Sequence, residues 1–137
     1  MAQNIDDFNR GVALILAHLY QRFPVPAMVK VAELDAHEDL LPEETERRDS
    51  RHTVYGAAIQ FLAEEGYLRY VKGELGSDAL VLTNKTLAAL QKTWFMPDAM
   101  FAPMSQTLAD TLIEATGDLL KDSAKELIRQ AIRIILG

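Results

Sequence analysis

The sequence contains no cysteine, and this absence excludes disulfides, thiolate nucleophiles and metal sites built on cysteine. Glycine and proline are also scarce, with 7 and 5 residues in a chain of 137. With 49% apolar and 25% charged residues, the composition is typical of a globular domain. A chain of this length buries a hydrophobic core without covalent cross-links.

Positive charge is in deficit, because 14 lysines and arginines face 20 acidic residues and the net charge is −6. An acidic chain is weakly attracted to nucleic acid and to anionic lipid. The apolar run "GVALILAHLY" is about ten residues long, which is too short to span a bilayer. The first residues, "MAQNIDDF", carry acids where an export signal has cations. We therefore predict a cytoplasmic protein with no membrane contact.

The motifs of common enzyme families are missing as well. The sequence has no phosphate-binding loop, no dinucleotide-binding fingerprint and no nucleophile elbow. Its three histidines, His18, His37 and His52, match no metal-binding spacing, and His18 lies in an apolar helix as a core histidine would. The sequence thus predicts no catalytic residue, no metal, no cofactor and no identifiable small-molecule site.

Apolar residues at helical spacing predict a first helix with one buried face. These residues are Phe8, Val12, Leu16, Leu19 and Phe23. Gly11 within this helix costs about 1 kcal/mol relative to alanine, so we expect another side chain to pack closely against it. The stretch "AMVKV" that follows the helix predicts a short strand.

Residues 49–90 carry the clearest pattern. "DSRHTVYGAAIQFLAEEG" predicts a helix that buries Val54, Ala58, Phe61 and Leu62 and ends at Gly66 in left-handed geometry. "YLRYV" and "ALVL" predict two strands joined by the turn "KGELGSD", and a helix carrying Leu87 and Leu90 follows.

The segments "TVYGAAIQFLAEEGYLRY" and "ALVLTNKTLAAL" resemble the third helix, wing and following helix of PadR- and MarR-type winged helix-turn-helix proteins. The resemblance covers about 40 of the 137 positions, and its most specific parts are residues 53–55, 64–68 and 82–83. It implies an α+β fold, mostly α, with a winged-helix domain over residues 1–92.

In these families the third helix enters the major groove of DNA and the wing touches the backbone. The resemblance therefore implies a dimeric DNA-binding transcriptional regulator that uses the 51–65 helix and the 72–78 wing. The contact residues carried over are Arg47, Arg48, Arg51, His52, Tyr55 and Lys72.

The charge of these two segments argues against DNA binding. Four acids in residues 43–52 outnumber the three arginines, and Glu74 and Asp78 outnumber Lys72. Glu43 and Glu44 also precede Arg47 and Arg48 by four positions, the favourable order for ion pairs on a helix. Because non-specific affinity for DNA comes largely from neutralised phosphates, such surfaces would bind it poorly.

Residues 93–104 form an apolar segment rich in methionine and aromatic residues. Pro97 and Pro103 exclude a single long helix here. The segment is either a strap over the core of its own domain or a docking surface for another chain.

The remaining residues, 105–137, predict a long amphipathic helix with Ser105 as a cap. Large and small residues alternate along it in a heptad seam, which we expect to be an interface. The seam consists of Ile113, Gly117, Leu120, Ala124, Leu127, Ala131 and Ile134. Burial of its four large side chains is worth about 6–12 kcal/mol, so the seam packs against the rest of the chain or against a second copy.

Two functional hypotheses follow. The first is a non-enzymatic winged-helix module for protein–protein interaction or self-assembly. The second is the dimeric DNA-binding regulator that the resemblance implies.

Overall fold

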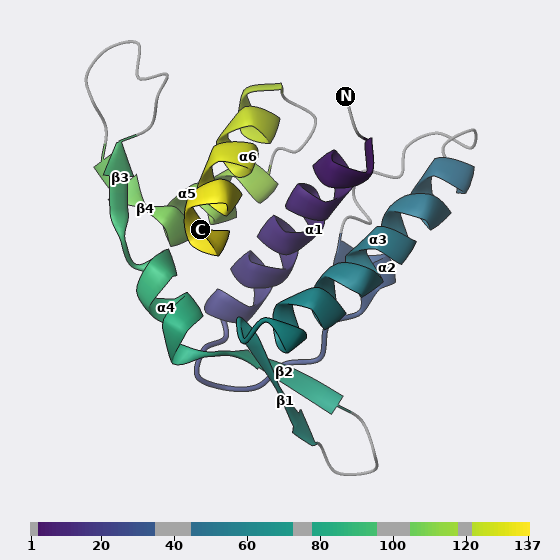
Figure 1. The fold of residues 1–137 in the computed structure, drawn as a ribbon, viewed down its shortest axis with the longest axis horizontal. Coiled ribbons are helices and arrows are strands. Elements are labelled where there is room, and N and C mark those ends of the chain that lie inside the picture. Colours follow the sequence, from purple (N-terminus) through teal and green to yellow (C-terminus); the bar gives the residue numbers. More distant parts are fainter. Residues whose placement is uncertain (1–2, 35–44, 73–77, 96–104, 118–121) are drawn as a thin grey trace.

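The computed structural model describes residues 3–34, 45–72, 78–95, 105–117 and 122–137 (Figure 1). The fold is mostly helical with two small antiparallel sheets, which confirms the predicted α+β class. In chain order, the elements are α1 (Gln3–Tyr20), α2 (Val31–Leu34), α3 (Thr45–Glu64), β1 (Leu68–Lys72), β2 (Asp78–Leu82), α4 (Asn84–Leu90), β3 (Thr93–Phe95), β4 (Ser105–Thr107), α5 (Leu108–Thr116) and α6 (Asp122–Leu136).

Helix α1 is the centre of the protein, with α3 on one side and α5 and α6 on the other (Figure 1). Every residue from Gly11 to Ala17 is buried. The predicted face is confirmed at Val12, Leu16 and Leu19, but burial extends around the whole helix over residues 11–17, which is more than the single face predicted. Phe23 lies beyond the helix and is 37% exposed.

Helix α3 packs along α1 and buries Tyr55, Ala58 and Leu62. The predicted face was correct for Ala58 and Leu62, but Val54 is only half-buried and Phe61 is 42% exposed. The expected close contact at Gly11 is confirmed, because a Cβ on this glycine would lie 2.5 Å from Cδ1 of Tyr55.

The hairpin of β1 and β2 follows directly from the end of α3. Gly66 has a φ of +82°, and the Tyr67 amide donates to the Leu62 carbonyl, as in a Schellman helix end. The strands pair from Leu68 with Leu82 to Lys72 with Asp78. This confirms the predicted hairpin.

The predicted strand at "AMVKV" is reduced to one bridge. The backbone of Ala27 exchanges two hydrogen bonds with Leu80 of β2, and the chain then turns into the short helix α2. The prediction of a strand was therefore wrong in extent, although this segment does lie beside the hairpin.

The long C-terminal helix that the sequence predicted is divided into two. Residues Ser105–Thr107 form β4, which pairs with β3, and the hydroxyl of Thr107, not Ser105, caps α5 by accepting from the Asp110 amide. Helix α5 ends at Gly117, and α6 begins at Asp122. Both helices pack against each other and against α1, so both bury apolar surface within the chain.

Two polar contacts fix these C-terminal elements. The indole Nε1 of Trp94 donates to the Thr111 hydroxyl at 2.8 Å, which joins β3 to α5. The Tyr67 hydroxyl donates to the Leu136 carbonyl at 3.0 Å, which joins the end of α6 to the hairpin. Trp94 packs against the core, as a strap would; residues 96–104 of that segment lie outside the described residues.

One hydrophobic core includes residues of α1, α3, both strands of the hairpin, α4, α5 and α6. The division of the chain into residues 1–92, 93–104 and 105–137 stays a prediction.

Candidate functional site

The inner face of α3 carries half of the predicted DNA contacts. Arg47 donates two hydrogen bonds to the carboxylate of Asp7 on α1, at 2.8 Å to Oδ2 and 2.6 Å to Oδ1. The hydrogen bonds to Asp7 raise the pKa of Arg47 above its usual value. Asp7 is only 3% exposed, so this is a buried carboxylate with a charged, bidentate partner.

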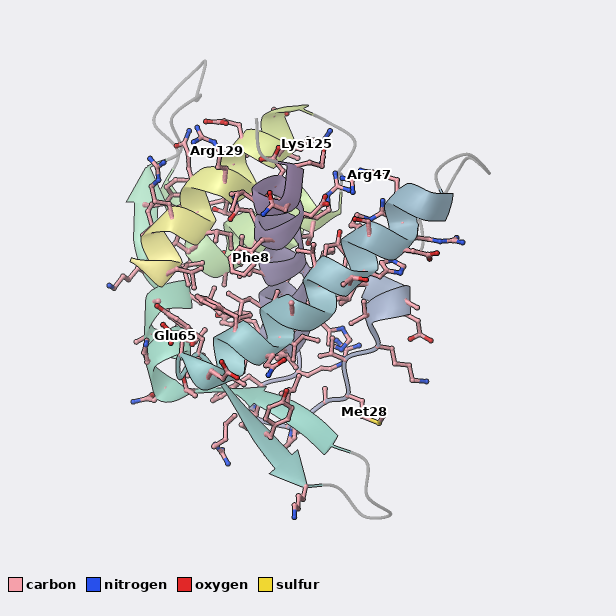
Figure 2. The ribbon with its side chains drawn as sticks, turned by 45° about the vertical axis from the view of Figure 1, so that its right-hand side comes forward. Phe8, Met28, Arg47, Glu65, Lys125 and Arg129 are labelled. Atoms are coloured by element: carbon pink, nitrogen blue, oxygen red, sulfur yellow. The ribbon has the colours of Figure 1, made fainter. Side chains whose placement is uncertain are left out.

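Arg51 and Tyr55 follow Arg47 at intervals of four residues and therefore share its face. Arg51 is 6% exposed and Tyr55 is completely buried. Figure 2 shows Arg47 between the N-terminal parts of α3 and α1. Three of the six predicted DNA-contact residues thus point into the protein.

The partner of Arg47 also differs from the expected one. The sequence favoured Glu43, which lies outside the described residues, as does Glu44. The sequence did not predict Asp7 as the partner, because it is 40 positions from Arg47 and the sequence does not show which helices pack side by side. The one indication of its burial was its position directly before Phe8, where the apolar pattern of the first helix begins.

The other three predicted contacts remain on the surface. Arg48 and His52 are half-buried, and Lys72 is exposed at the far end of β1. The His52 ring lies 5.8 Å from the Tyr55 ring. Among the described side chains of α3, the exposed charged ones are Asp49 and Glu64, both acidic. The outer face of this helix thus combines the half-buried Arg48 and His52 with two exposed acids.

The predicted seam residues do not share one face. Ile113 and Gly117 are on or next to α5, whereas Ala124, Leu127, Ala131 and Ile134 are on α6, and Leu120 lies outside the described residues. The face of α6 that packs inward is made by Ala124, Ile128, Ala131, Ile132 and Ile135. Among the seam residues that the structure describes, Ile134 is the most exposed large one, at 46%.

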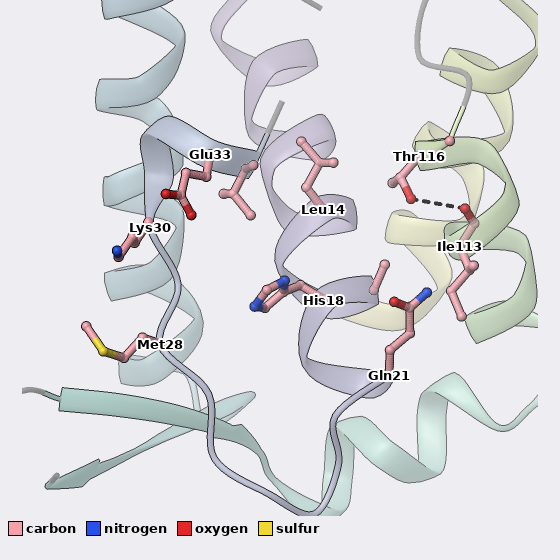
Figure 3. Close-up of a pocket in the computed structure, with 11 residues that line it drawn as sticks. Leu14, His18, Gln21, Met28, Lys30, Glu33, Ile113 and Thr116 are labelled. Atoms are coloured by element: carbon pink, nitrogen blue, oxygen red, sulfur yellow. Dashed lines mark hydrogen bonds between the residues drawn. The ribbon is translucent and has the colours of Figure 1, made fainter. Parts of the chain in front are cut away.

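A pocket of about 320 Å³ lies between α1, residues 28–34 and the end of α5 (Figure 3). Its apolar part includes Leu14, Leu34 and Ile113, and its polar part includes His18 and Glu33. The sequence did not predict this pocket because its walls come from three separate segments.

His18 in this pocket is held by Arg22. The guanidinium of Arg22 lies 3.3 Å from Nδ1 of His18 and also donates to the His18 carbonyl. Because arginine has no acceptor, Nδ1 must accept this bond and Nε2 carries the proton. Burial and the neighbouring Arg22 charge lower the pKa of His18, although a hydrogen bond with the Met28 backbone opposes them.

This lowered pKa predicts a pH-dependent stability. The unfolded chain takes up a proton at His18 near pH 6.5, before the folded chain does, so the free energy of unfolding should fall as the pH drops below about 6.5. Urea unfolding of the wild type and a His18→Gln variant at several pH values measures the effect. The variant should lose less stability in this pH range; equal losses in the two proteins would contradict the prediction.

A second hollow, of about 350 Å³, lies between the N-terminal half of α1 and the C-terminal half of α6. We call it the α1–α6 groove. It is lined by Ile5, Asn9, Arg129, Ile132, Arg133, Leu136 and Gly137.

Within the described ranges, no three side chains of the types His, Asp and Glu come together as a metal site would require. No helix in the described part of the chain is both long and apolar enough to cross a membrane. No protein-family model, curated protein or solved structure matches the chain.

Proposed function

We propose that this protein is a non-enzymatic winged-helix module that binds another protein in the cytoplasm. The order of its elements supports the winged-helix assignment. Helix α1, the Ala27 bridge, α2, α3, the β1–β2 hairpin and α4 follow one another as in the PadR- and MarR-type proteins that the sequence resembles. The Ala27 bridge would stand for the first strand, and the hairpin would be the wing.

The orientation of α3 favours a protein partner over DNA. A recognition helix needs cations on its outer face, since phosphate neutralisation provides most of the non-specific affinity. Here Arg47 is committed to Asp7, Arg51 is buried and Arg48 is half-buried, whereas the fully exposed charged groups among the described side chains of α3 are Asp49 and Glu64. The inward-facing arginines are the observation on which the proposal rests.

The packing of α6 bears on the partner. Its apolar face is used against α1 and α5 within the chain, so little of the predicted seam remains for a coiled-coil contact with a second copy. This favours a partner of different sequence.

Fluorescence anisotropy with mixed-sequence duplex DNA tests the proposal. We expect no binding by the wild type at micromolar protein, even at about 50 mM salt, where electrostatic affinity is strongest. An Asp49→Lys/Glu64→Lys variant is the matched control. It makes the outer face of α3 cationic and should gain DNA affinity that declines steeply between about 50 and 200 mM salt.

Salt-sensitive binding by the wild type that weakens on Lys72→Ala substitution would overturn the proposal in favour of the DNA-binding regulator. Lys72 is suitable for this purpose because it is exposed on β1 and its removal leaves the core intact.

A further inference from the structure

An apolar stripe crosses the surface from α3 over α1 to α6. The rings of Phe61 on α3 and Phe8 on α1 meet edge to face, with centroids 5.4 Å apart. Figure 2 shows Phe8 between α3 and α6. Phe61 is 42% exposed and Ile5, one turn before Phe8, is 53% exposed. Ile5 then lines the α1–α6 groove with Ile132 and Leu136.

The charges on this groove are opposite to those of the chain as a whole. Its lining contains Arg129 and Arg133 and no acidic side chain, whereas the chain has a net charge of −6. Arg129 donates a hydrogen bond to the carboxylate of Glu126 and also interacts electrostatically with Asp6. Glu126 interacts electrostatically with Arg133 as well, but no described residue forms a hydrogen bond or ion pair with the guanidinium of Arg133. Arg133 is therefore an exposed cation beside exposed apolar surface.

We propose that the α1–α6 groove binds an acidic amphipathic helix of another protein. This inference names the partner chemistry for the protein-binding role proposed above and rests on it. In such a complex the apolar residues of the ligand helix cover Ile5, Phe8 and Leu136. Its carboxylates pair with Arg133 and compete with Glu126 for Arg129. Apolar anchors at helical spacing in a groove between helices are a common mode of peptide recognition.

The charge distribution disfavours a second copy as the occupant. A two-fold contact places the same patch of each copy against the other. Arg129 and Arg133 would then face their own counterparts across the interface, and like charges brought together weaken binding.

The probe is a synthetic helical peptide of about 16 residues, with leucine at positions i, i+4, i+7 and i+11 and glutamate on the flanking positions. Full-length ¹⁵N-labelled protein is titrated with it and followed by two-dimensional NMR. We expect shifts in the amides of Ile5, Asn9 and Arg133 and a saturable affinity. A peptide with lysine in place of glutamate should bind at least about tenfold more weakly.

Two pairs of variants localise the binding. Arg133→Glu should weaken the acidic peptide about tenfold, whereas Lys125→Glu, an exposed position on α6 outside the groove, should not. Ile5→Ser should weaken it, whereas Ile134→Ser, an exposed isoleucine elsewhere on α6, should not. All four substitutions are at exposed positions and should leave α1 and α6 folded, and circular dichroism checks this.

Four results would overturn the inference. The first three are no shift up to about 1 mM peptide, where even weak binding is detectable; shifts confined to other surfaces; and equal affinity for the basic peptide. The fourth is a set of shifts at Ile5 and Arg133 that depend on protein concentration without peptide, which would assign the groove to a second copy. The DNA measurement above fails or succeeds independently, so the two proposals are separable.

Discussion

Replacement of Arg47 by methionine is expected to lower the free energy of unfolding by about 3–5 kcal/mol, the usual cost of stranding one partner of a buried ion pair. The carboxylate of Asp7 has 5% of its side-chain surface exposed, so it recovers little hydration when the guanidinium is removed, and the hydrogen bond from Gln3 Nε2 at 3.5 Å does not replace a charged partner. The expected loss is large because both Asp7 oxygens accept from Arg47. Urea unfolding of the two proteins at pH 7 measures it.

Substitution of the other partner, Asp7, should lower the free energy of unfolding by less. In an Asp7→Asn variant, Arg47 keeps a charge, but its side chain is 33% exposed and can turn toward water. A double variant, Asp7→Leu/Arg47→Met, should recover most of the loss, since a buried ion pair can often be replaced by apolar residues without net cost. A loss below about 1 kcal/mol for Arg47→Met would show that the pair is not the buried link described here.

The packing role of Arg47 also bears on function. Any defect of an Arg47 variant in a binding assay would reflect the altered packing of α1 against α3, and could not by itself be assigned to a lost contact with DNA.

What could be predicted from the sequence was mainly local. Gly66 and the strands beside it specify the end of α3 and the hairpin through turn geometry and strand propensity, which depend on neighbouring residues. A close contact at Gly11 was also predictable, because glycine destabilises a helix unless a neighbouring group leaves no room for a side chain. That the neighbour is Tyr55 was not predictable, since this contact joins two helices.

The C-terminal region shows why a regular pattern can mislead. The heptad spacing from Ile113 to Ile134 is real, but Gly117 ends α5 and the seam is divided between two helices. Tertiary packing prevails here because α5 and α6 each bury an apolar face against α1. Packing of an apolar face supplies most of the stability of a helix in a protein, so the contacts with α1 outweigh the regular spacing.

The candidate surfaces were the least predictable part. The α1–α6 groove joins Ile5 to Arg133 and Leu136, which are at opposite ends of the sequence. The inward direction of Arg47 depends on Asp7, on a different helix. Neither feature has a local signature, so charge counts along a segment could not distinguish a paired arginine from an available one.

The contact between Gly11 and Tyr55 leads to the second prediction with a large effect. Alanine substitutions at two glycines should change the free energy of unfolding in opposite directions. Gly11→Ala should destabilise the protein, because the added Cβ would lie 2.5 Å from a ring carbon of a completely buried tyrosine. Overpacking of this kind costs about 1–3 kcal/mol. Gly56→Ala should stabilise it by about 0.5–1 kcal/mol, because Gly56 lies within α3 and a Cβ there meets nothing within 4 Å.

The comparison of the two variants isolates the packing cost. Both substitutions gain helix propensity of similar size, so the difference between their free energies of unfolding reports the clash with Tyr55 and should be about 1–3 kcal/mol. Chemical denaturation of the wild type and both variants provides the measurement. Stabilisation by both alanines would contradict the close packing of α1 on α3.

A Tyr55→Leu background tests the cause. The smaller side chain is destabilising on its own, since it leaves a cavity beside Gly11. It also removes the ring carbons that the new Cβ would meet, so Gly11→Ala should cost less in this background than in the wild type. Such non-additivity is the signature of two residues in direct contact. Helix α1 also packs against α5 and α6, so a shift of α1 that relieved the clash would disturb those contacts. We therefore expect the effects of the Gly11 and Tyr55 substitutions on stability to depend on each other.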